Sequence, residues 1–279
     1  MKRILTIQDI SCVGKCSLTV ALPIISAFGV ETAVLPTAVL STHTAFDGFT
    51  FRDLTADIKG IVNHWTKQNI NFNAIYTGYL GSFEQLDLVS EIFDTFKRND
   101  TLFLVDPVMA DNGKLYHGFD QKFALSMAKL CSKADIIVPN LTEASFMLNI
   151  PYVADGYSEE YIKDILKQLT ALGCKTAVLT GISFEKDKLG VYGYDSEKNE
   201  YFYYYNKRLP QSFHGTGDIF ASSLCGALTK GYSLGQALEI AVDFTVKSIE
   251  LTVKNPNHNW YGVDFESAFP YLIERIKQN

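Results

Sequence analysis

Short apolar runs that alternate with longer amphipathic stretches constrain the fold of this chain more than any other feature. The apolar runs have the length and composition of strands and cover residues 3–7, 33–40, 74–77, 101–107, 134–139 and 176–180. Helical periodicity covers residues 18–28, 54–68, 83–96, 119–129, 142–149 and 159–172. Several predicted strands are apolar on both faces, as expected where helices cover both sides of a parallel sheet. We therefore predict a three-layer α/β/α sandwich with a mostly parallel central sheet.

The C-terminal part of the chain departs from this alternation. Residues 189–194 and 200–206 flank a polar stretch and suit an antiparallel hairpin at a sheet edge. Helical patterns follow over residues 217–229, 234–253 and 265–276. Because no linker, repeat or low-complexity tract divides the 279 residues, we expect a single domain over residues 1–279.

Composition disfavours several classes of function. The N-terminus lacks the apolar core of a signal peptide, and no run of eighteen apolar residues occurs. The net charge is −6, and basic residues cluster no further than adjacent pairs, so a nucleic-acid surface is not expected. The five cysteines are scattered and odd in number, which fits reduced thiols. We expect a soluble cytoplasmic protein with no nucleic-acid partner and no membrane partner.

The stretch from His214 to Asp218 is the most informative motif. Gly215, Thr216 and Gly217 free the backbone where a long helix begins, and the amides of a helix N-terminus form an anion site. Asp218 lies in the first turn of that helix. An acidic residue there is also an ordinary helix-stabilising feature, so this motif alone leaves both interpretations open.

Polar side chains follow two neighbouring predicted strands. The segment 106–111 begins with Asp106 and ends with Asp111, and the next strand leads into Asn140 and Glu143. The carboxyl ends of parallel strands meet at the edge where open α/β sheets bind ligands. Asp106, Asn140 and Glu143 offer hard oxygen ligands that suit Mg²⁺ carried in with nucleotide phosphates. The alternative for Glu143 is a structural role at a helix N-terminus.

These three motifs, in this order, resemble those of the ribokinase-like superfamily, and the resemblance covers essentially the whole chain. Within the superfamily, Thr77-Gly78-Tyr79 and Ser41-Thr42-His43-Thr44 are similar to stretches of the vitamin B6 kinases. The resemblance implies transfer of the γ-phosphoryl group of ATP to the 5′-hydroxymethyl group of pyridoxal, pyridoxamine or pyridoxine. It also implies Mg²⁺ as a cofactor and a homodimer, and it leaves a monovalent cation open as a further cofactor.

The resemblance also implies roles for individual residues. Asp218 would accept the hydroxyl proton, while the Gly215-Thr216-Gly217 amides would stabilise charge on the phosphoryl oxygens. The residues expected at the vitamer are Asp9, Ser41, His43, Thr44, Tyr79 and Asp218. Those expected at ATP are Asp106, Asp111, Asn140, Glu143, Thr180, Gly181, His214, Gly215 and Gly217. The expected metal ligands are Asp106, Asn140 and Glu143.

Two positions depart from the family pattern. The better-known B6 kinases carry Gln-Ser after the first strand, where this chain has Gln8-Asp9. A carboxylate there would pair with a protonated pyridine nitrogen or an amine, so a preference for pyridoxamine is a hypothesis. Ala110 stands where the family usually has glycine, a mild change that leaves Asp111 expected to face the phosphates.

Three other functions remain as alternatives. Hydroxymethylpyrimidine kinases share a His-Gly-Thr-Gly stretch, but they often have cysteine at the position of Asp218 and a glycine-rich loop after the first strand. A catalytically silent protein that binds a vitamer or nucleotide would keep the fold without turnover. The third is a sugar kinase of the ribokinase type, which usually has a β-lid inserted between early strands; here the predicted strand over residues 33–40 leaves little room for a lid before the next helix. A P-loop nucleotide-hydrolysing enzyme is rejected, because Gly14-Lys15-Cys16-Ser17 lacks the glycine and the Ser or Thr that the motif requires.

Overall fold

The computed structural model describes residues 1–277 and groups the chain into two compact units. Unit 1 combines Met1–Tyr76 with the chain from Asn206 onward, and unit 2 is Thr77–Tyr205. Within residues 1–277, no helix is long and apolar enough to cross a membrane. The single domain expected from the sequence stays a prediction.

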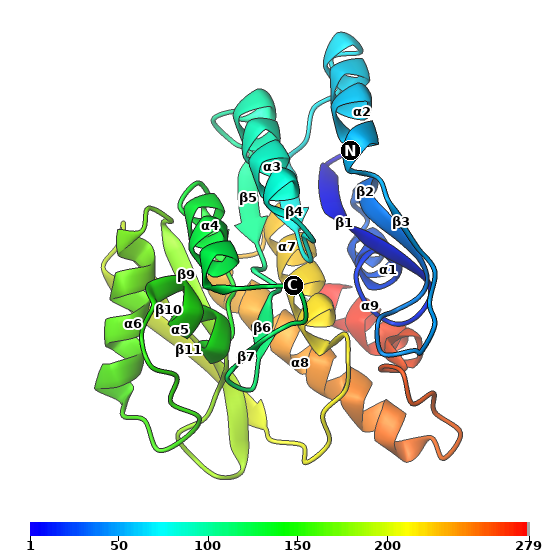
Figure 1. The fold of residues 1–279 in the computed structure, drawn as a ribbon. Coiled ribbons are helices and arrows are strands. Elements are labelled where there is room, and N and C mark those ends of the chain that lie inside the picture. The colour runs from blue at the N-terminus through cyan, green and yellow to red at the C-terminus, as the bar shows by residue number, and fades with distance from the viewer. Residues whose placement is uncertain (278–279) are drawn as a thin grey trace. The chain divides into compact units, whose positions relative to one another are not determined.

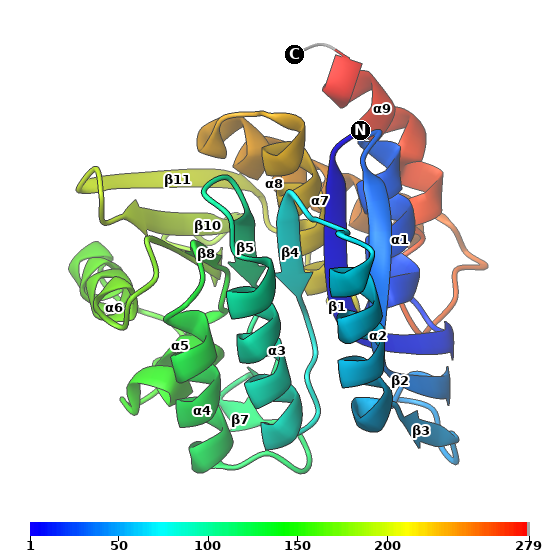
Figure 2. The same ribbon diagram turned by 90° about the horizontal axis from the view of Figure 1, so that it is seen from above.

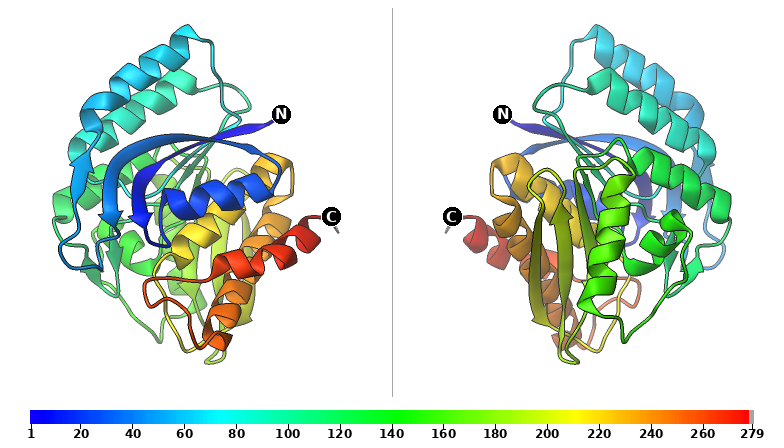
Figure 3. Two further views of the ribbon diagram at one scale, coloured as in Figure 1. Left: turned by 90° about the vertical axis from the view of Figure 1, so that its right-hand side faces the viewer. Right: turned by 90° about the vertical axis from the view of Figure 1, so that its left-hand side faces the viewer.

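Unit 1 is built on strands in the order β4-β1-β2-β3, where β1 and β2 run parallel and β3 is antiparallel to β2. Helix α2 lies on one face of β1 and β2, while α1 and α7 lie on the opposite face (Figure 3). The elements are β1 Arg3–Val13, α1 Leu18–Ala27, β2 Glu31–Thr42, β3 Phe51–Asp53, α2 Thr55–Lys67, β4 Ala74–Thr77, α7 Thr216–Lys230, α8 Leu234–Lys254, η1 Phe265–Ala268 and α9 Phe269–Lys277.

Burial explains the central position of β1 in unit 1. Ile4, Leu5 and Ile7 are fully buried, as expected for a parallel strand covered on both faces. The pairing of β1 with β2 shifts register between Gln8 and Ile10. A bulge of this kind re-aims a side chain and often lies next to a functional site. It therefore sets the direction of Asp9.

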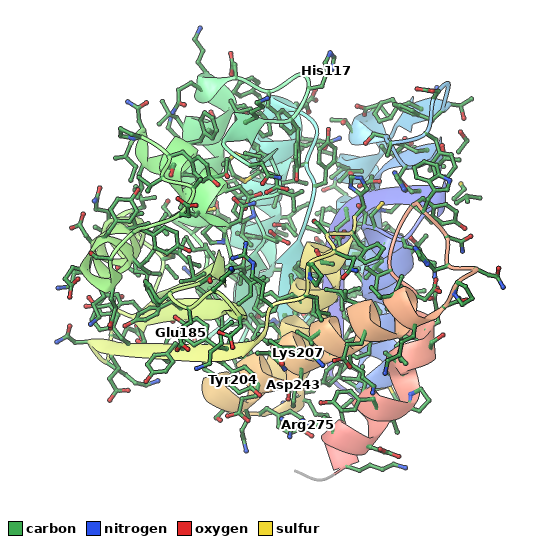
Figure 4. All side chains as sticks on the ribbon, turned by 90° about the horizontal axis from the view of Figure 1, so that it is seen from below. His117, Glu185, Tyr204, Lys207, Asp243 and Arg275 are labelled. Carbon is green, nitrogen blue, oxygen red and sulfur yellow. The ribbon has the colours of Figure 1, made fainter. Side chains whose placement is uncertain are left out.

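The C-terminal helix of unit 1 is held by charged groups on α8. Arg275 of α9 donates to the Asp243 carboxylate at 2.9 Å, and Asn206 donates to the same carboxylate at 2.8 Å. Figure 4 labels Asp243 and Arg275, which lie beside each other. These contacts anchor both ends of the C-terminal half of unit 1.

Unit 2 contains strands in the order β11-β10-β9-β8-β5. Strands β5, β8 and β9 are parallel, and β10 runs antiparallel to β9. Helices α3, α4, α5 and α6 lie on one face of these strands (Figure 2). The elements are α3 Phe83–Phe96, β5 Leu102–Val105, β6 Ala110–Asp111, β7 Lys114–Leu115, α4 Gln121–Cys131, β8 Ile136–Ile137, α5 Leu141–Leu148, α6 Glu159–Ala171, β9 Thr176–Ile182, β10 Lys188–Asp195 and β11 Glu200–Lys207.

The predicted mixed α/β class, parallel strands and antiparallel edge hairpin are confirmed. Figure 1 labels the elements, with colour running along the chain. Three short strands were not predicted. Of these, β6 and β7 form a hairpin around Asn112 and Gly113, whose φ angles are 51° and 75°. Positive φ at both central residues suits a type I′ turn, for which Asn-Gly is a favoured sequence. The Asn112-Gly113 pair could therefore have predicted this hairpin from the sequence.

Candidate active site

The loop before α7 has the geometry of an anion site. Gly215 is the N-cap of α7 and has a φ of 84°, a conformation that favours glycine. A Cβ atom at this position would overlap the carbonyl oxygen of Lys15. The first N–H groups of a helix have no partner within the helix and point outward with the positive end of the dipole. Only glycine therefore allows the loop to present these amides so close to the segment before α1.

Asp218 lies in the first turn of α7 and is partly buried. Burial of its carboxyl raises the pKa to about 7, and the negative charge of Asp9 adds to the rise. A backbone hydrogen bond from Ser17 acts in the opposite direction. A carboxylate with a pKa near neutral pH can take up a proton during turnover and release it to solvent afterwards. Asp218 therefore has the proton affinity of a general base.

Asp9 is 6% exposed and accepts two hydroxyl hydrogen bonds. Ser17 Oγ donates to Oδ1 at 2.6 Å, and Ser11 Oγ donates to Oδ2 at 3.4 Å. Burial raises the pKa of Asp9, against the effect of these hydrogen bonds and of nearby His43. Ser17, a residue that the sequence analysis did not single out as functional, thus holds the Asp9 carboxylate through its hydroxyl.

Cys16 lies beside the same two carboxyls. Its Sγ is 3.7 Å from Ser11 Oγ, and burial together with the charges of Asp218 and Asp9 raises the pKa of the thiol to about 12. A thiol with such a pKa stays protonated and is a poor nucleophile. Cys16 is therefore a neutral neighbour of the carboxyls.

His43 at the end of β2 is buried, and both of its ring nitrogens have partners. Nδ1 accepts from the backbone N–H of Ala45 at 3.1 Å, so Nε2 carries the proton and donates to the Tyr261 carbonyl at 2.9 Å. Burial lowers the pKa of His43, and the charge of His214 lowers it further. The ring centroids of His43 and His214 are 5.6 Å apart. His43 is therefore a neutral residue that ties two loops of unit 1 together.

The other residues expected near the vitamer in unit 1 have different surroundings. Ser41 Oγ accepts from the N–H of Thr50 at 2.8 Å and closes the loop that follows β2. Thr44 is exposed. Neither observation tests a role in vitamer binding, so the assignments of Ser41 and Thr44 stay predictions.

Lys15 forms an ion-pair cluster that the sequence analysis missed. Its ammonium group lies 2.6 Å from Glu266 Oε2 and 3.2 Å from Asp264 Oδ1. The pKa of Lys15 is raised because these two carboxylates outweigh its burial. A Cβ at Gly262 would overlap the Lys15 side chain. Lys15, the lysine of the rejected P-loop pattern, therefore ties its own loop, which lies against Gly215, to Asp264 and Glu266.

In unit 2, Asn140 and Glu143 form a capping box at the start of α5. Asn140 Oδ1 accepts from the Glu143 N–H at 2.9 Å, and Glu143 Oε2 accepts from the Asn140 N–H at 2.8 Å. Glu143 Oε1 also accepts from the Met109 N–H at 3.2 Å, and Asn140 Nδ2 donates to the Ala110 carbonyl at 2.9 Å. The structural alternative weighed for Glu143 is thus realised.

Asp106 lies close enough to Glu143 to affect its ionisation. Glu143 is 3% exposed and Asp106 is 7% exposed. Burial raises the pKa of Glu143 well above its usual value, and the charge of Asp106 raises it further. A divalent cation would offset the repulsion between two such carboxylates. Within residues 1–277, no three or more His, Cys, Asp or Glu side chains group as a metal site, so the metal assignment stays a prediction.

The remaining predicted ATP residues of unit 2 lie near the capping box or at the end of β9. Thr180 N donates to the Pro139 carbonyl at 3.0 Å, and Gly181 follows with a φ of 71°. Asp111 is exposed and accepts from the N–H and side chain of Asn112. The end of an ordinary strand would show the same hydrogen bond at Thr180. The roles of these residues at ATP therefore also stay predictions.

Tyr79 follows β4 and is half-buried. Its ring lies 5.7 Å from that of Phe119, in a tilted arrangement. The predicted stacking surface for the pyridine ring is thus an aromatic side chain packed against a second ring. Its role at the vitamer is not tested by this contact.

The chain matches the phosphomethylpyrimidine kinase family model over residues 25–263. A Bacteroides thetaiotaomicron protein provisionally assigned as a phosphomethylpyrimidine kinase has a crystal structure with a TM-score of 0.93 and 40% identity, covering 97% of this chain and 93% of its own. A second crystal form under that name contains pyridoxal, with a TM-score of 0.91, 40% identity, and coverage of 97% and 95%.

Two further relatives carry the name pyridoxal kinase. The crystal structure of pyridoxal kinase from Lactobacillus plantarum has a TM-score of 0.90 and 31% identity, covering all of this chain and 99% of its own. The curated pyridoxal kinase of Dictyostelium discoideum is 26% identical over 275 residues, covering 92% of this chain and 87% of its own. The resemblance to the vitamin B6 kinases is confirmed.

Proposed function

This chain belongs to the phosphomethylpyrimidine kinase family, and we propose that it transfers the γ-phosphoryl group of ATP to the 5′-hydroxymethyl group of a B6 vitamer. Its relatives include several proteins that carry the name pyridoxal kinase. The observation that carries the proposal is a carboxyl with a pKa of about 7, Asp218, in the turn after the Gly215-Thr216-Gly217 anion loop. A kinase that activates an alcohol needs both features.

Asp218 accepts the proton of the vitamer's hydroxymethyl group as that oxygen bonds to the γ-phosphorus and the bond to ADP breaks. Its raised pKa makes it a stronger base than an ordinary aspartate, while leaving it largely ionised above pH 7. The amides of the loop from Gly215 to Gly217 stabilise the negative charge on the phosphoryl oxygens. His214, which precedes this loop, contacts a nucleotide phosphate in the proposal.

Vitamer recognition is assigned to Asp9, Ser41, His43, Thr44 and Tyr79. His43 acts indirectly, because both of its ring nitrogens already bind the backbone. It holds the β2 loop against the chain near Tyr261. The carboxylate at Asp9 favours a vitamer with a positive charge, which is the basis of the proposed preference for pyridoxamine.

ATP is assigned to unit 2 residues and to the anion loop. In the proposal, Asp106 and Glu143 hold Mg²⁺, and Asn140 contributes through the cap that orients Glu143. The fit rests on the two buried carboxylates, whose mutual repulsion a cation would reduce. When bound, Mg²⁺ supplies positive charge to the phosphate oxygens. Asp111, Thr180 and Gly181 complete the proposed nucleotide contacts, and a monovalent cation is a further proposed cofactor.

Hydroxymethylpyrimidine phosphorylation is the second candidate. It is favoured by the description of the matching family and by the provisional assignment of the Bacteroides protein. The acceptor is again a hydroxymethyl group on a nitrogen heterocycle, so the same base and anion loop would serve. Aspartate at position 218, where that group often has cysteine, favours the vitamer.

Release of ADP from ATP and Mg²⁺ by the purified protein tests the proposal. Pyridoxal, pyridoxamine, pyridoxine, hydroxymethylpyrimidine and ribose are compared as acceptors. Efficient turnover of the B6 vitamers is the expected result. Turnover of hydroxymethylpyrimidine alone would move the function to the second candidate, and vitamer binding without ADP release would leave a silent binding protein. We further propose that the protein is cytoplasmic and that it forms a homodimer. Sedimentation of the purified protein tests the homodimer.

A further inference from the structure

The backbone of Lys15 lies directly against the first residue of the anion loop. A Cβ atom at Gly215 would overlap the Lys15 carbonyl oxygen and would come within 3.1 Å of the carbonyl carbon. Lys15 belongs to neither neighbouring element, because β1 ends at Val13 and α1 begins at Leu18. The anion loop therefore rests on a connecting segment that needs its own support.

The side chain of Lys15 provides this support. Its ammonium lies 2.6 Å from Glu266 Oε2, 3.2 Å from Asp264 Oδ1 and 5.5 Å from the centre of the Phe265 ring. The side chains of Lys15 and Asp264 are only 13% and 12% exposed, whereas that of Glu266 is 54% exposed. Charges that are partly buried are screened less by salt and water than exposed charges. The pair of Lys15 with Asp264 is therefore the stronger constraint.

Asp264 is itself held in place at the end of α8. Its N–H donates to Thr252 Oγ1 at 2.8 Å, and its Oδ2 accepts from Asn255 Nδ2 at 3.0 Å. Thr252 is fully buried in α8. The chain just before Asp264 also packs on the lysine, because a Cβ atom at Gly262 would overlap Lys15 Cβ. The ammonium thus binds a carboxylate that is fixed to the helical part of unit 1.

We propose that Lys15 is a positioning residue: its ion pairs with Asp264 and Glu266 fix the segment against which Gly215 rests, and so keep the amides of the anion loop aimed at one point. This role rests on the proposed function only in the phosphoryl group that is assigned to those amides. The ion pairs and the backbone contact belong to the protein without substrate.

The composition of the anion loop explains why it needs a support. Glycine has more backbone freedom than any other residue, and the loop contains Gly215 and Gly217. Amides stabilise charge in a transition state only when they are already oriented toward the place where the charge develops. A neighbouring segment that is fixed by ion pairs restricts the loop from one side. Loss of those pairs should therefore reduce kcat more than it changes KM for the acceptor.

Nitrogen-15 NMR relaxation of the protein without substrate measures the order of the loop. In Lys15→Met, which keeps an unbranched stem and removes the ammonium, the order parameters of the N–H groups of residues 215–217 should fall from about 0.85 to about 0.7 or lower. Arg3→Met is the matched control, because it removes an ion pair with Glu31 at the opposite end of β1. Unchanged loop order in Lys15→Met, or an equal fall in Arg3→Met, would overturn the proposal.

Steady-state turnover tests the consequence for catalysis. Lys15→Met should lower kcat for pyridoxal phosphorylation by about tenfold and change KM for pyridoxal by less than about threefold. Lys15→Arg keeps a cation that both carboxylates can bind, so it should recover most of the lost turnover. A wild-type kcat in Lys15→Met, or no recovery in Lys15→Arg, would contradict a positioning role for the ion pairs.

Glu266→Gln separates positioning from direct attraction between Lys15 and a phosphate. It removes only the exposed partner, so the protein should fold even if Lys15→Met does not. Positioning predicts a small fall in loop order and a kcat lowered by about twofold to threefold. Direct attraction predicts a higher kcat, because the ammonium would lose a competing carboxylate, and that result would overturn the proposal. If no acceptor were phosphorylated, the proposed function would fail, and the order parameters would still decide the role of Lys15.

Discussion

Asp218 in unit 1 and Glu143 in unit 2 are carboxyls whose pKa values are raised by similar causes but whose surroundings differ. For each, burial raises the pKa most, and a neighbouring carboxylate, Asp9 or Asp106, raises it further. The difference lies in the backbone amides. Glu143 accepts from the N–H groups of Asn140 and Met109, whereas Asp218 lies in the first turn of α7, where the Ser17 backbone only partly opposes the rise in its pKa. A raised pKa alone therefore does not identify a general base. The carboxyl must also have an oxygen that can reach the substrate.

The partners of each carboxyl explain this contrast. The oxygens of Glu143 satisfy amides at the start of α5 and after β5, groups that would otherwise be buried without a partner. Asp218 lies beside a glycine loop whose amides are presented for an anion. Both oxygens of Glu143 are thus bound to the fold, and Asp218 lies next to the proposed anion loop.

The largest expected effect that separates the two carboxyls is on turnover. Asp218→Asn is expected to lower kcat for the best acceptor by about 10²-fold or more, the usual scale for loss of a general base. Glu143→Gln, which keeps an acceptor oxygen for the cap, should lower kcat less. Steady-state ADP release measures both. Near-normal turnover by Asp218→Asn would remove Asp218 as the base.

The second effect concerns the stability cost of keeping Asp218 ionised. Its folded pKa of about 7 exceeds the ordinary 3.8, so the folded state holds the proton more tightly than the unfolded state. The resulting destabilisation is absent below the unfolded pKa, grows as the pH rises and is complete above the folded pKa. Asp218→Asn should therefore raise the free energy of unfolding by about 2–4 kcal/mol at pH 8 and by less at pH 5.

Urea unfolding of Asp218→Asn and wild type at pH 5 and pH 8 measures this difference. The comparison of the two pH values separates the titration of Asp218 from any general effect of the substitution. A variant that is less stable than the wild type at pH 8 would show that the charge of Asp218 is well compensated in the fold.

Glu143 is expected to behave in the opposite way. Glu143→Ala leaves the amides of Asn140 and Met109 without their acceptor and should lower the free energy of unfolding by about 1–3 kcal/mol. Glu143→Gln should lower it less, because one oxygen still accepts and the repulsion with Asp106 is removed. Thermal and urea unfolding provide the measurement. If Glu143→Ala were as stable as the wild type, the capping box would not be its main role.

The smallest expected effect concerns the choice of vitamer. Asp9→Ser restores the residue of the better-known B6 kinases and should lower the ratio of kcat/KM for pyridoxamine to that for pyridoxal by about threefold to tenfold. The reason is the lost attraction between the carboxylate and a cationic amine. Equal ratios in variant and wild type would remove Asp9 from the choice of vitamer.

Much of the fold follows from sequence patterns, because hydrophobic periodicity reports which faces are buried. The pattern predicted α3 and β4 with the same bounds as the structure has, and it placed the edge hairpin of β10 and β11. The pattern ended β1 at residue 7, whereas the strand continues to Val13 through the polar residues Asp9 and Ser11. Those two residues are polar but buried, and Ser11 donates to Asp9, so an apolar pattern could not report them.

The candidate site was predictable where a motif marks a backbone requirement. Gly215 and Asp218 could be identified because a glycine loop before a helix has a physical purpose, and Asn140 with Glu143 fits the spacing of a capping box. The role of Ser17 could not be predicted. Its positive φ and its hydrogen bond to Asp9 depend on how β1 and α1 pack, and no local pattern encodes that packing.

The pH dependence of kcat for pyridoxal phosphorylation tests the central claim most directly, since it reports the ionisation of Asp218 in the enzyme during turnover. Turnover requires the ionised carboxylate, so kcat should be highest above pH 7 and should fall tenfold per pH unit below the Asp218 pKa of about 7. Vitamer turnover that is independent of pH from about 5.5 to 8 would contradict the account.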